Sequence, residues 1–273
     1  MAIATTTGLT DMQRATFERD GYLLIPAALS PDEVARLGDA VDRVWWAHRD
    51  VPAVRGAEAL HLLAFLGWEE AFLELLDHPV TLPIVVDLLG WNIFMYHCHL
   101  DVHPPEPEEI EPRWMWHQDG GRQNLELETE PRPRMSVKVA YFLSDCGEPG
   151  RGNFRVLPGS HRRNELPRPD EGGTADPAGA VPVLAGAGDA VVFDRRLWHM
   201  RDRNRSTLTR RALFTAYTYR WVRPRDELHL RPELFGVLTP VRAQLLGASA
   251  GGAIGYWIPS ADATPLRDRV AGA

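Results

Sequence analysis

Hydrophobic residues follow two different rhythms along the chain, and the change between them falls near Gly90. In the first part, Ser30 is followed by a proline and two acids, and apolar residues then recur at helical spacing. This pattern predicts a helix with Ser30 as its N-cap that runs to about Trp46. Helices are also expected at residues 10–17, 69–76 and 80–89, and an apolar strand at residues 22–25 is closed by Pro26.

After Gly90, short runs rich in β-branched and aromatic residues are separated by Gly, Pro and Asn. Strands are expected at residues 93–100, 135–143, 153–157, 190–193 and 212–219. This spacing is typical of an antiparallel barrel or sandwich. We therefore predict an α+β protein with a mainly β core, as one domain over residues 1–273. Its helical front end would cover about 1–90 and its β core about 91–222.

Two polar segments, residues 103–113 and 167–180, have compositions that disfavour regular structure and are expected to be loops. The first leads directly into the segment with the most distinctive chemistry. We expect one of the two loops, and more specifically residues 103–113, to close over bound substrate.

Composition narrows the possible functions. The 273 residues are 44% hydrophobic and 25% charged, which excludes disorder over most of the length. A formal net charge of −7 offers no general attraction to nucleic acid or anionic lipid. No apolar run approaches the roughly 18 residues of a membrane span, so we expect a cytoplasmic protein without a membrane partner. We also expect a small-molecule substrate and no nucleic-acid partner. Cys98 and Cys146 are too few for a disulfide framework, and the oligomeric state stays open.

The segment around His117 carries the strongest chemical signal. His117 and Asp119 lie two residues apart on extended chain, so their side chains point to the same side. If the sheets fold over each other, His199 can supply a third ligand. Two histidines and one carboxylate on one face of an octahedral ion leave three positions open, which is the arrangement of non-haem Fe(II) oxygenases. Iron is the favoured metal, and these three residues are the predicted catalytic centre.

An arginine follows at a suitable distance. Arg210 lies 11 residues beyond His199, at the start of an apolar strand. Its planar guanidinium can hold a dicarboxylate end-on. The adjacent Arg211 leaves the register ambiguous, although the 11-residue offset favours Arg210.

With these residues in place, the chain resembles the phytanoyl-CoA dioxygenase family of Fe(II)- and 2-oxoglutarate-dependent oxygenases. The likeness extends from Phe17 to about Tyr219. Four segments carry it: Asp-Gly-Tyr-Leu-Leu-Ile-Pro at residues 20–26, His-Gln-Asp at 117–119, Gly-Asn-Phe-Arg-Val-Leu-Pro-Gly-Ser-His at 152–161, and His199 with Arg210.

The resemblance implies a double-stranded β-helix, the cupin-like jelly roll, with helices packed on one sheet. It also implies iron held by His117, Asp119 and His199, with 2-oxoglutarate and O₂ as cosubstrates. Arg210 would bind the far carboxylate of 2-oxoglutarate, and Tyr141 would lie against it. Family members that halogenate replace the metal carboxylate with a small residue, so the intact Asp119 favours hydroxylation.

Several residues are candidates for the substrate pocket. Trp116 and Trp198 flank the ligand segments, and His99 lies on a predicted strand, so all three are expected at the pocket wall. Three histidines alternate on this strand and its exit: His97, His99 and His103. We do not expect them to form a second metal site, because Asp101, the carboxylate that would complete it, is expected to point away. His161 is expected to be structural, and the arginines after Phe193, apart from Arg210, are expected to be surface charge.

Together these features indicate an Fe(II)/2-oxoglutarate dioxygenase that hydroxylates an unactivated C–H bond of a small organic molecule, such as a natural-product intermediate. Succinate and CO₂ would be released. Two alternatives stay open: a zinc hydrolase that uses the same ligands, and a non-catalytic barrel that binds a metal or metabolite. The sequence does not name the substrate, nor does it separate hydroxylation from desaturation, ring closure or epimerisation.

Overall fold

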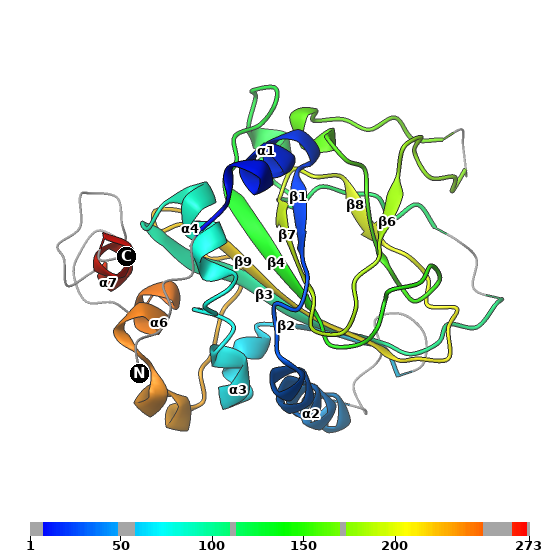
Figure 1. The fold of residues 1–273 in the computed structure, drawn as a ribbon. Coiled ribbons are helices and arrows are strands. Elements are labelled where there is room, and N and C mark those ends of the chain that lie inside the picture. Colours follow the sequence, from blue (N-terminus) through cyan, green and yellow to red (C-terminus); the bar gives the residue numbers. More distant parts are fainter. Residues whose placement is uncertain (1–7, 49–57, 110–112, 170–172, 248–263, 272–273) are drawn as a thin grey trace.

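Two antiparallel sheets form the centre of the molecule, with helices beside them (Figure 1). The computed structural model describes residues 8–48, 58–109, 113–169, 173–247 and 264–271. The six-stranded sheet has the order β1-β7-β4-β9-β3-β2, and the three-stranded sheet has the order β6-β5-β8. The strands are β1 (Tyr22–Ile25), β2 (Leu60–Leu63), β3 (Ile93–His103), β4 (Ser136–Phe142), β5 (Phe154–Val156), β6 (Val181–Val183), β7 (Ala190–Asp194), β8 (His199–Arg201) and β9 (Arg210–Tyr219).

Helices cover the face of the large sheet that lies away from the small one. The two longest begin at side-chain caps: Ser30, the predicted N-cap, forms a capping box with Glu33, and Thr10, which was expected inside the first helix, forms one with Gln13. The described helices are α1 (Asp11–Asp20), α2 (Pro31–Ala47), α3 (Glu70–Leu73), α4 (Leu82–Leu89), α5 (Gln123–Glu126), α6 (Pro240–Leu245) and α7 (Pro265–Ala271), with short 3₁₀ turns at Phe65–Gly67, Ser160–Arg162 and Pro232–Val237. None of the helices in these ranges has the length and apolar character needed to cross a membrane.

The large sheet is buried on both faces, and the alternation of its side chains divides the interior in two. On β4, Val139 and Tyr141 join the core shared with the helices, whereas Ala140 and Phe142 join the core between the sheets. The space between the sheets is therefore lined by every second residue of the central strands. This rule decides which side chains can reach the cavity described below.

The structure confirms the predicted helices and strands and adds others. β3 continues to His103, and β2, β6 and β8 were not expected. Two of these are only three residues long, and β2 pairs with β3 across a separation of about 40 residues, which no local pattern reveals. The front end is not only helical, because β1 and β2 form the two edges of the large sheet.

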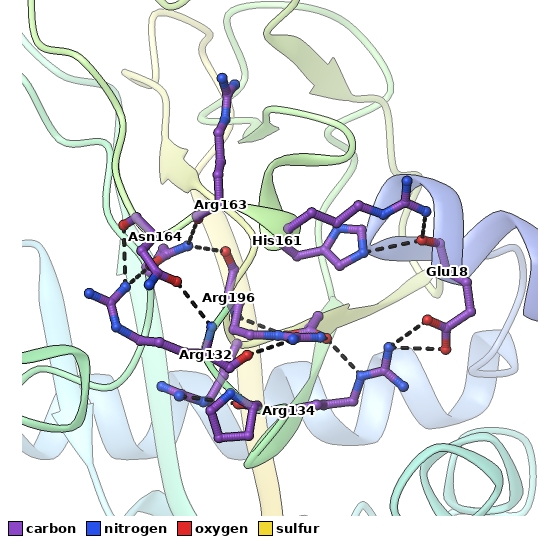
Figure 2. Close-up of polar contacts among 12 residues, drawn as sticks. Glu18, Arg132, Arg134, His161, Arg163, Asn164 and Arg196 are labelled. Carbon is purple, nitrogen blue, oxygen red and sulfur yellow. Dashed lines mark hydrogen bonds and ion pairs between the residues drawn. The ribbon is translucent and has the colours of Figure 1, made fainter. Parts of the chain in front are cut away.

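A network of arginines fastens α1 to the end of β7 (Figure 2). Arg134 donates to Glu18 at 2.9 Å and to Asp194 at 2.7 Å. Arg196 contacts the same Asp194 oxygen at 2.7 Å and donates to the carbonyl of Arg132 at 2.7 Å. Burial alone would raise the pKa of Asp194, but hydrogen bonds and charge from Arg196 and Arg134 lower it below its usual value. The fully buried carboxylate of Asp194 thus joins three chain segments.

Replacing this carboxylate should destabilise the protein. We expect Asp194→Ala to lower the free energy of unfolding by about 3–5 kcal/mol, because two guanidinium groups lose their buried counter-charge. Denaturant unfolding measures the change. Arg36→Ala, which removes an exposed ion pair with Glu74, is the control and should cost only about 0.2–1 kcal/mol. Equal losses in the two variants would contradict the role given to Asp194.

Candidate metal centre and its cavity

A cavity of about 830 Å³ lies between the sheets and is lined by both of them. This volume suits a small-molecule site. Its wall contains side chains from β3, β4, β7, β8 and β9, and its exposed rim includes Arg122 and Arg223. His117, Asp119, His199 and Arg210 all line it.

His117 and His199 are held together by the backbone. Each donates its N–H to the carbonyl of the other at 3.0 Å, and the ring centroids are 4.3 Å apart. In each ring, Nδ1 lies 2.8 Å from the carbonyl of the residue two positions earlier, Met115 or Leu197. A carbonyl only accepts hydrogen bonds, so Nδ1 carries the proton and Nε2 offers its lone pair.

Asp119 completes the group. Its backbone N–H donates to the carbonyl of Arg195 at 2.9 Å, and Lys138 Nζ donates to its Oδ1 at 3.0 Å. Lys138 Nζ is also 3.0 Å from Oδ2, but that buried oxygen accepts no hydrogen bond and lies 4.0 Å from His199 Nε2. One ligand atom from each of the three residues lies within 4.8 Å of the other two.

The electrostatics of the group suit a cation. Burial, and next the neighbouring His117, lower the pKa of His199 to about 3, so its ring is neutral. Burial alone would raise the pKa of Asp119, but Lys138 and the two histidines lower it far below its usual value. Metal ligands must be deprotonated, and both of these groups are. The Oδ2 atom, which accepts no hydrogen bond, and the two Nε2 lone pairs therefore fit a divalent metal ion.

Two cationic residues of this centre were not predicted from the sequence. Lys138, the one lysine of the chain, is buried and ion-paired with Asp119. Arg195 is fully buried and donates to the Asp119 carbonyl at 3.2 Å, so the expectation that the arginines after Phe193 are surface charge was wrong for it. Lys138 could have been found from the strand pattern, because it shares the inward side of β4 with Ala140.

The structure separates the two neighbouring arginines of β9. Arg210 is buried in the cavity wall, whereas Arg211 lies on the outer face and pairs with Asp42 of α2 at 2.7 Å. Arg210 Nε and Nη1 are buried and have no hydrogen-bond partner. Gly152 makes room for this side chain, because a Cβ there would lie 2.8 Å from Arg210 Cδ. A buried guanidinium with unused donors is suited to an anionic ligand.

Tyr141, Trp116 and Trp198 do not face the cavity. The Tyr141 hydroxyl lies 2.6 Å from Thr81 Oγ1 in the helical layer, so the expected contact with a cosubstrate was wrong. The odd-numbered residues of β4 face outward, which is the physical reason. Trp116 donates its indole N–H to Asp176 at 3.0 Å, and neither tryptophan is among the cavity-lining residues. Each precedes a metal-site histidine by one residue and so points to the opposite side.

The β3 histidines do line the cavity, and so does Asp101. The expectation that Asp101 points away was wrong. Residues two positions apart on a strand share one face, and this places Asp101 beside His97, His99 and His103. His99 lies at the wall as expected and stacks on Phe214 with ring centroids 4.3 Å apart.

His161 and the first loop are anchored. His161 is buried, and its Nε2 donates to the carbonyl of Glu18 at 3.2 Å. In the first loop, the Glu106 N–H donates to the Asn204 carbonyl at 2.7 Å, and its carboxylate pairs with Arg201 at 2.5 Å. The proposed closing part of this loop includes residues 110–112, which lie outside the described residues, as do residues 170–172 of the second loop.

Comparisons with known proteins point to one family. The sequence profile of the phytanoyl-CoA dioxygenase (PhyH) family matches residues 17–212. The ectoine dioxygenase of Stutzerimonas stutzeri (strain A1501) is 25% identical over 235 residues, which cover 74% of each chain. The uncharacterized protein Rv1501 of Mycobacterium tuberculosis (strain ATCC 25618 / H37Rv) is 44% identical over 209 residues, which cover 72% of this chain and 71% of the relative.

The fold also has solved counterparts. The structure of HygX from Streptomyces hygroscopicus, with nickel and 2-oxoglutarate bound, matches with a TM-score of 0.65 at 18% identity. The match covers 83% of this chain and 94% of HygX. The likeness confirms the predicted jelly roll with helices packed on one sheet.

The ion pair of Lys138 leads to a test that needs no substrate. We expect Lys138→Met to destabilise the metal-free protein by about 3–5 kcal/mol, because Asp119 then carries an uncompensated buried charge. Divalent metal should restore much of this loss, since the cation supplies the missing charge. Unfolding with and without Co²⁺ measures both effects, and Lys138→Arg is the charge-preserving control. A loss that metal does not reduce would contradict this role for Lys138.

Proposed function

The chain belongs to the phytanoyl-CoA dioxygenase family, and on that premise we propose that it is an Fe(II)- and 2-oxoglutarate-dependent hydroxylase of a small organic molecule. The observation that carries the proposal is the convergence of ligand atoms from His117, His199 and Asp119 in one cavity, where Asp119 Oδ2 accepts no hydrogen bond. Two histidines and one carboxylate with open positions are the ligand set of non-haem Fe(II) oxygenases.

Three residues would hold the metal, and their neighbours would keep them in place. The carbonyls of Met115 and Leu197 fix the histidine tautomers, and Lys138 holds Asp119 Oδ1 so that Oδ2 faces the histidines. Such supporting contacts orient metal ligands and are part of a metal site. The bound iron would supply the activation of O₂, coupled to decarboxylation of 2-oxoglutarate to succinate and CO₂.

Arg210 would bind the far carboxylate of 2-oxoglutarate. Its Nε and Nη1 are buried donors without partners, and Phe142 lies under the guanidinium at 5.6 Å from ring centroid to Cζ. A carboxylate bound there would satisfy these donors in a site that excludes water. The tight fit against Gly152 keeps the guanidinium in one position.

The substrate would enter through the exposed rim and lie on the side of the metal ligands that faces solvent. The cavity volume of about 830 Å³ limits it to a small molecule together with 2-oxoglutarate. The relative named ectoine dioxygenase is consistent with a compact substrate. We propose a natural-product or other secondary-metabolism intermediate, whose C–H bond receives one oxygen atom of O₂ while the other enters succinate.

The experiment that tests the function is a coupled assay. Protein loaded with Fe(II) should consume O₂ and form succinate from 2-oxoglutarate, and a substrate hit from a small-molecule library should raise the rate and yield a product heavier by one oxygen. Hydrolysis with Zn²⁺ and no O₂ demand would support the zinc hydrolase instead. Metal and metabolite binding without succinate would support the non-catalytic barrel.

Each metal ligand should be essential. We expect His117→Ala, Asp119→Ala and His199→Ala each to abolish succinate formation and to lose tight Fe(II) binding, because two remaining ligands provide neither the affinity nor the facial geometry. Metal content after dialysis and the circular dichroism spectrum are the readouts. A folded variant that retains Fe(II) and turnover would remove that residue from the centre.

The two arginines of β9 should behave differently. We expect Arg210→Ala to weaken 2-oxoglutarate binding by about 2–5 kcal/mol, or roughly 30- to several-thousand-fold, because a charge-assisted contact in a closed pocket is lost. Arg211→Ala is the matched control, since its side chain pairs with Asp42 on the opposite face. Anaerobic calorimetry measures both dissociation constants. A larger effect at Arg211 would overturn the assignment.

A further inference from the structure

A second group of metal-binding side chains lies on the cavity wall, apart from the centre described above. His61 of β2 pairs in register with Asp101 of β3, and His99 lies two residues before Asp101 on the same face. One ligand atom from each of these three residues lies within 4.8 Å of the other two. His103 adds a further imidazole, with its Nε2 3.9 Å from Asp101 Oδ2.

This group is distinct from the Asp119 centre. Lys138, which pairs with Asp119, lies opposite Ala216 of β9, and Ala216 lies opposite His97 of β3. Asp101 lies four residues further along β3, which is roughly 13 Å of strand. An ion at one group would therefore use none of the ligands of the other.

A chain of hydrogen bonds fixes the tautomer of His99. Arg225 Nη1 donates to His97 Nε2 at 2.7 Å, so His97 carries its proton on Nδ1, which lies 2.7 Å from Asp226. His99 Nδ1 lies 3.2 Å from the same accepting His97 Nε2 and must donate to it. Burial lowers the pKa of His99 well below its usual value, so the ring is neutral. Its Nε2 therefore carries a lone pair.

That lone pair faces a carboxylate. His99 Nε2 lies 3.8 Å from Asp101 Oδ2, and neither atom can donate a hydrogen bond to the other. Asp101 is buried, and its Oδ1 accepts a hydrogen bond from His61 Nδ1 at 2.6 Å. Two electron-rich atoms 3.8 Å apart repel each other, and a cation bound between them would remove that repulsion. Histidines that bind a metal commonly donate their other ring N–H to a fixed acceptor, and His99 Nδ1 has such an acceptor in His97 Nε2.

We propose that His61, His99 and Asp101 form a second divalent-cation site, with His103 as an adjacent fourth donor. Two or three imidazoles and one carboxylate are a ligand set of Zn²⁺. His61 is 38% exposed and gives an ion a path from solvent, while the cavity side leaves room for a water or ligand oxygen. On binding, the metal would displace the proton of the hydrogen bond, 2.6 Å long, from His61 Nδ1 to Asp101, and that proton would move to His61 Nε2 or to solvent.

The position of this site gives it a role, and this step rests on the proposed function. Asp101 Oδ2 lies 3.9 Å from Arg210 Nη1, too far for a hydrogen bond. A second carboxylate, from 2-oxoglutarate, would be repelled by Asp101 on arrival at Arg210. A dication held by Asp101 would reverse the sign of that interaction, although Arg210 itself opposes the ion. Zn²⁺ at the second site should therefore strengthen the binding of 2-oxoglutarate.

Metal stoichiometry tests the site without any assay of turnover. Metal-free protein is loaded with Co²⁺ or Zn²⁺, dialysed, and analysed for metal content and visible absorption. We expect two equivalents in the unchanged protein and one in the double variant Asp119→Ala/His199→Ala. We also expect one equivalent in His61→Ala and in Asp101→Asn, which is nearly isosteric. His229→Ala, which removes an exposed histidine, is the matched control and should keep both.

The hydrogen bonds that link Asp226, His97 and His99 allow an independent test. His97→Phe removes the acceptor for His99 Nδ1 and should weaken Co²⁺ at the second site about 10- to 100-fold, with the first site unchanged. Two results would overturn the proposal. One is a single metal equivalent in the unchanged protein, and the other is a second equivalent that persists in both His61→Ala and Asp101→Asn. Loss of the first site alone would refute the proposed function and leave this site standing.

Discussion

The buried carboxylate of Asp119 is the constraint on which the cavity depends. A carboxylate removed from water is costly unless charge and hydrogen bonds replace its hydration. Lys138 on β4 provides that compensation at 3.0 Å, and the backbone of Asp119 is held by Arg195, which follows β7. The ion pair therefore joins the metal-binding segment to the large sheet, while the bridge between His117 and His199 joins that segment to the small one. Lys138 Nζ lies 3.0 Å from both oxygens of Asp119, but Oδ2 accepts no hydrogen bond and stays available for a cation.

Much of this arrangement could be predicted from the sequence, because local periodicity decides which side of a strand a residue occupies. The two-residue spacing of His117 and Asp119 and the cap at Ser30 are local features, and in the structure the two side chains lie together and Ser30 caps its helix. The same rule explains two errors. Tyr141 shares the outward side of β4 with Val139, and Asp101 shares the inward side of β3 with His99, so a consistent count of residues would have placed both.

Other features depend on pairings that no local pattern contains. His61 reaches Asp101 only because β2 pairs with β3, and β2 is four residues long and follows a segment without a strong strand signal. The burial of Arg195 likewise follows from where the ends of β7 and of the His117 segment meet. Its sequence context, a run of arginines, is that of a solvated surface. Long-range register thus decides which charged residues become part of the interior.

The two buried carboxylates of the cavity are compensated in different ways, and the difference separates stability from ligand binding. Asp119 has a permanent ammonium partner, so its charge is balanced before any ligand arrives. Asp101 has imidazole neighbours and a guanidinium that stays 3.9 Å away. If Arg210 bonded directly to Asp101, its donors would be used and an incoming carboxylate would have to displace an internal ion pair. The hydrogen bond from His61 holds the Asp101 carboxylate, and the Arg210 donors stay open. The imidazoles thus take the place of a fixed cation beside Asp101 and leave the buried guanidinium of Arg210 free for an incoming carboxylate.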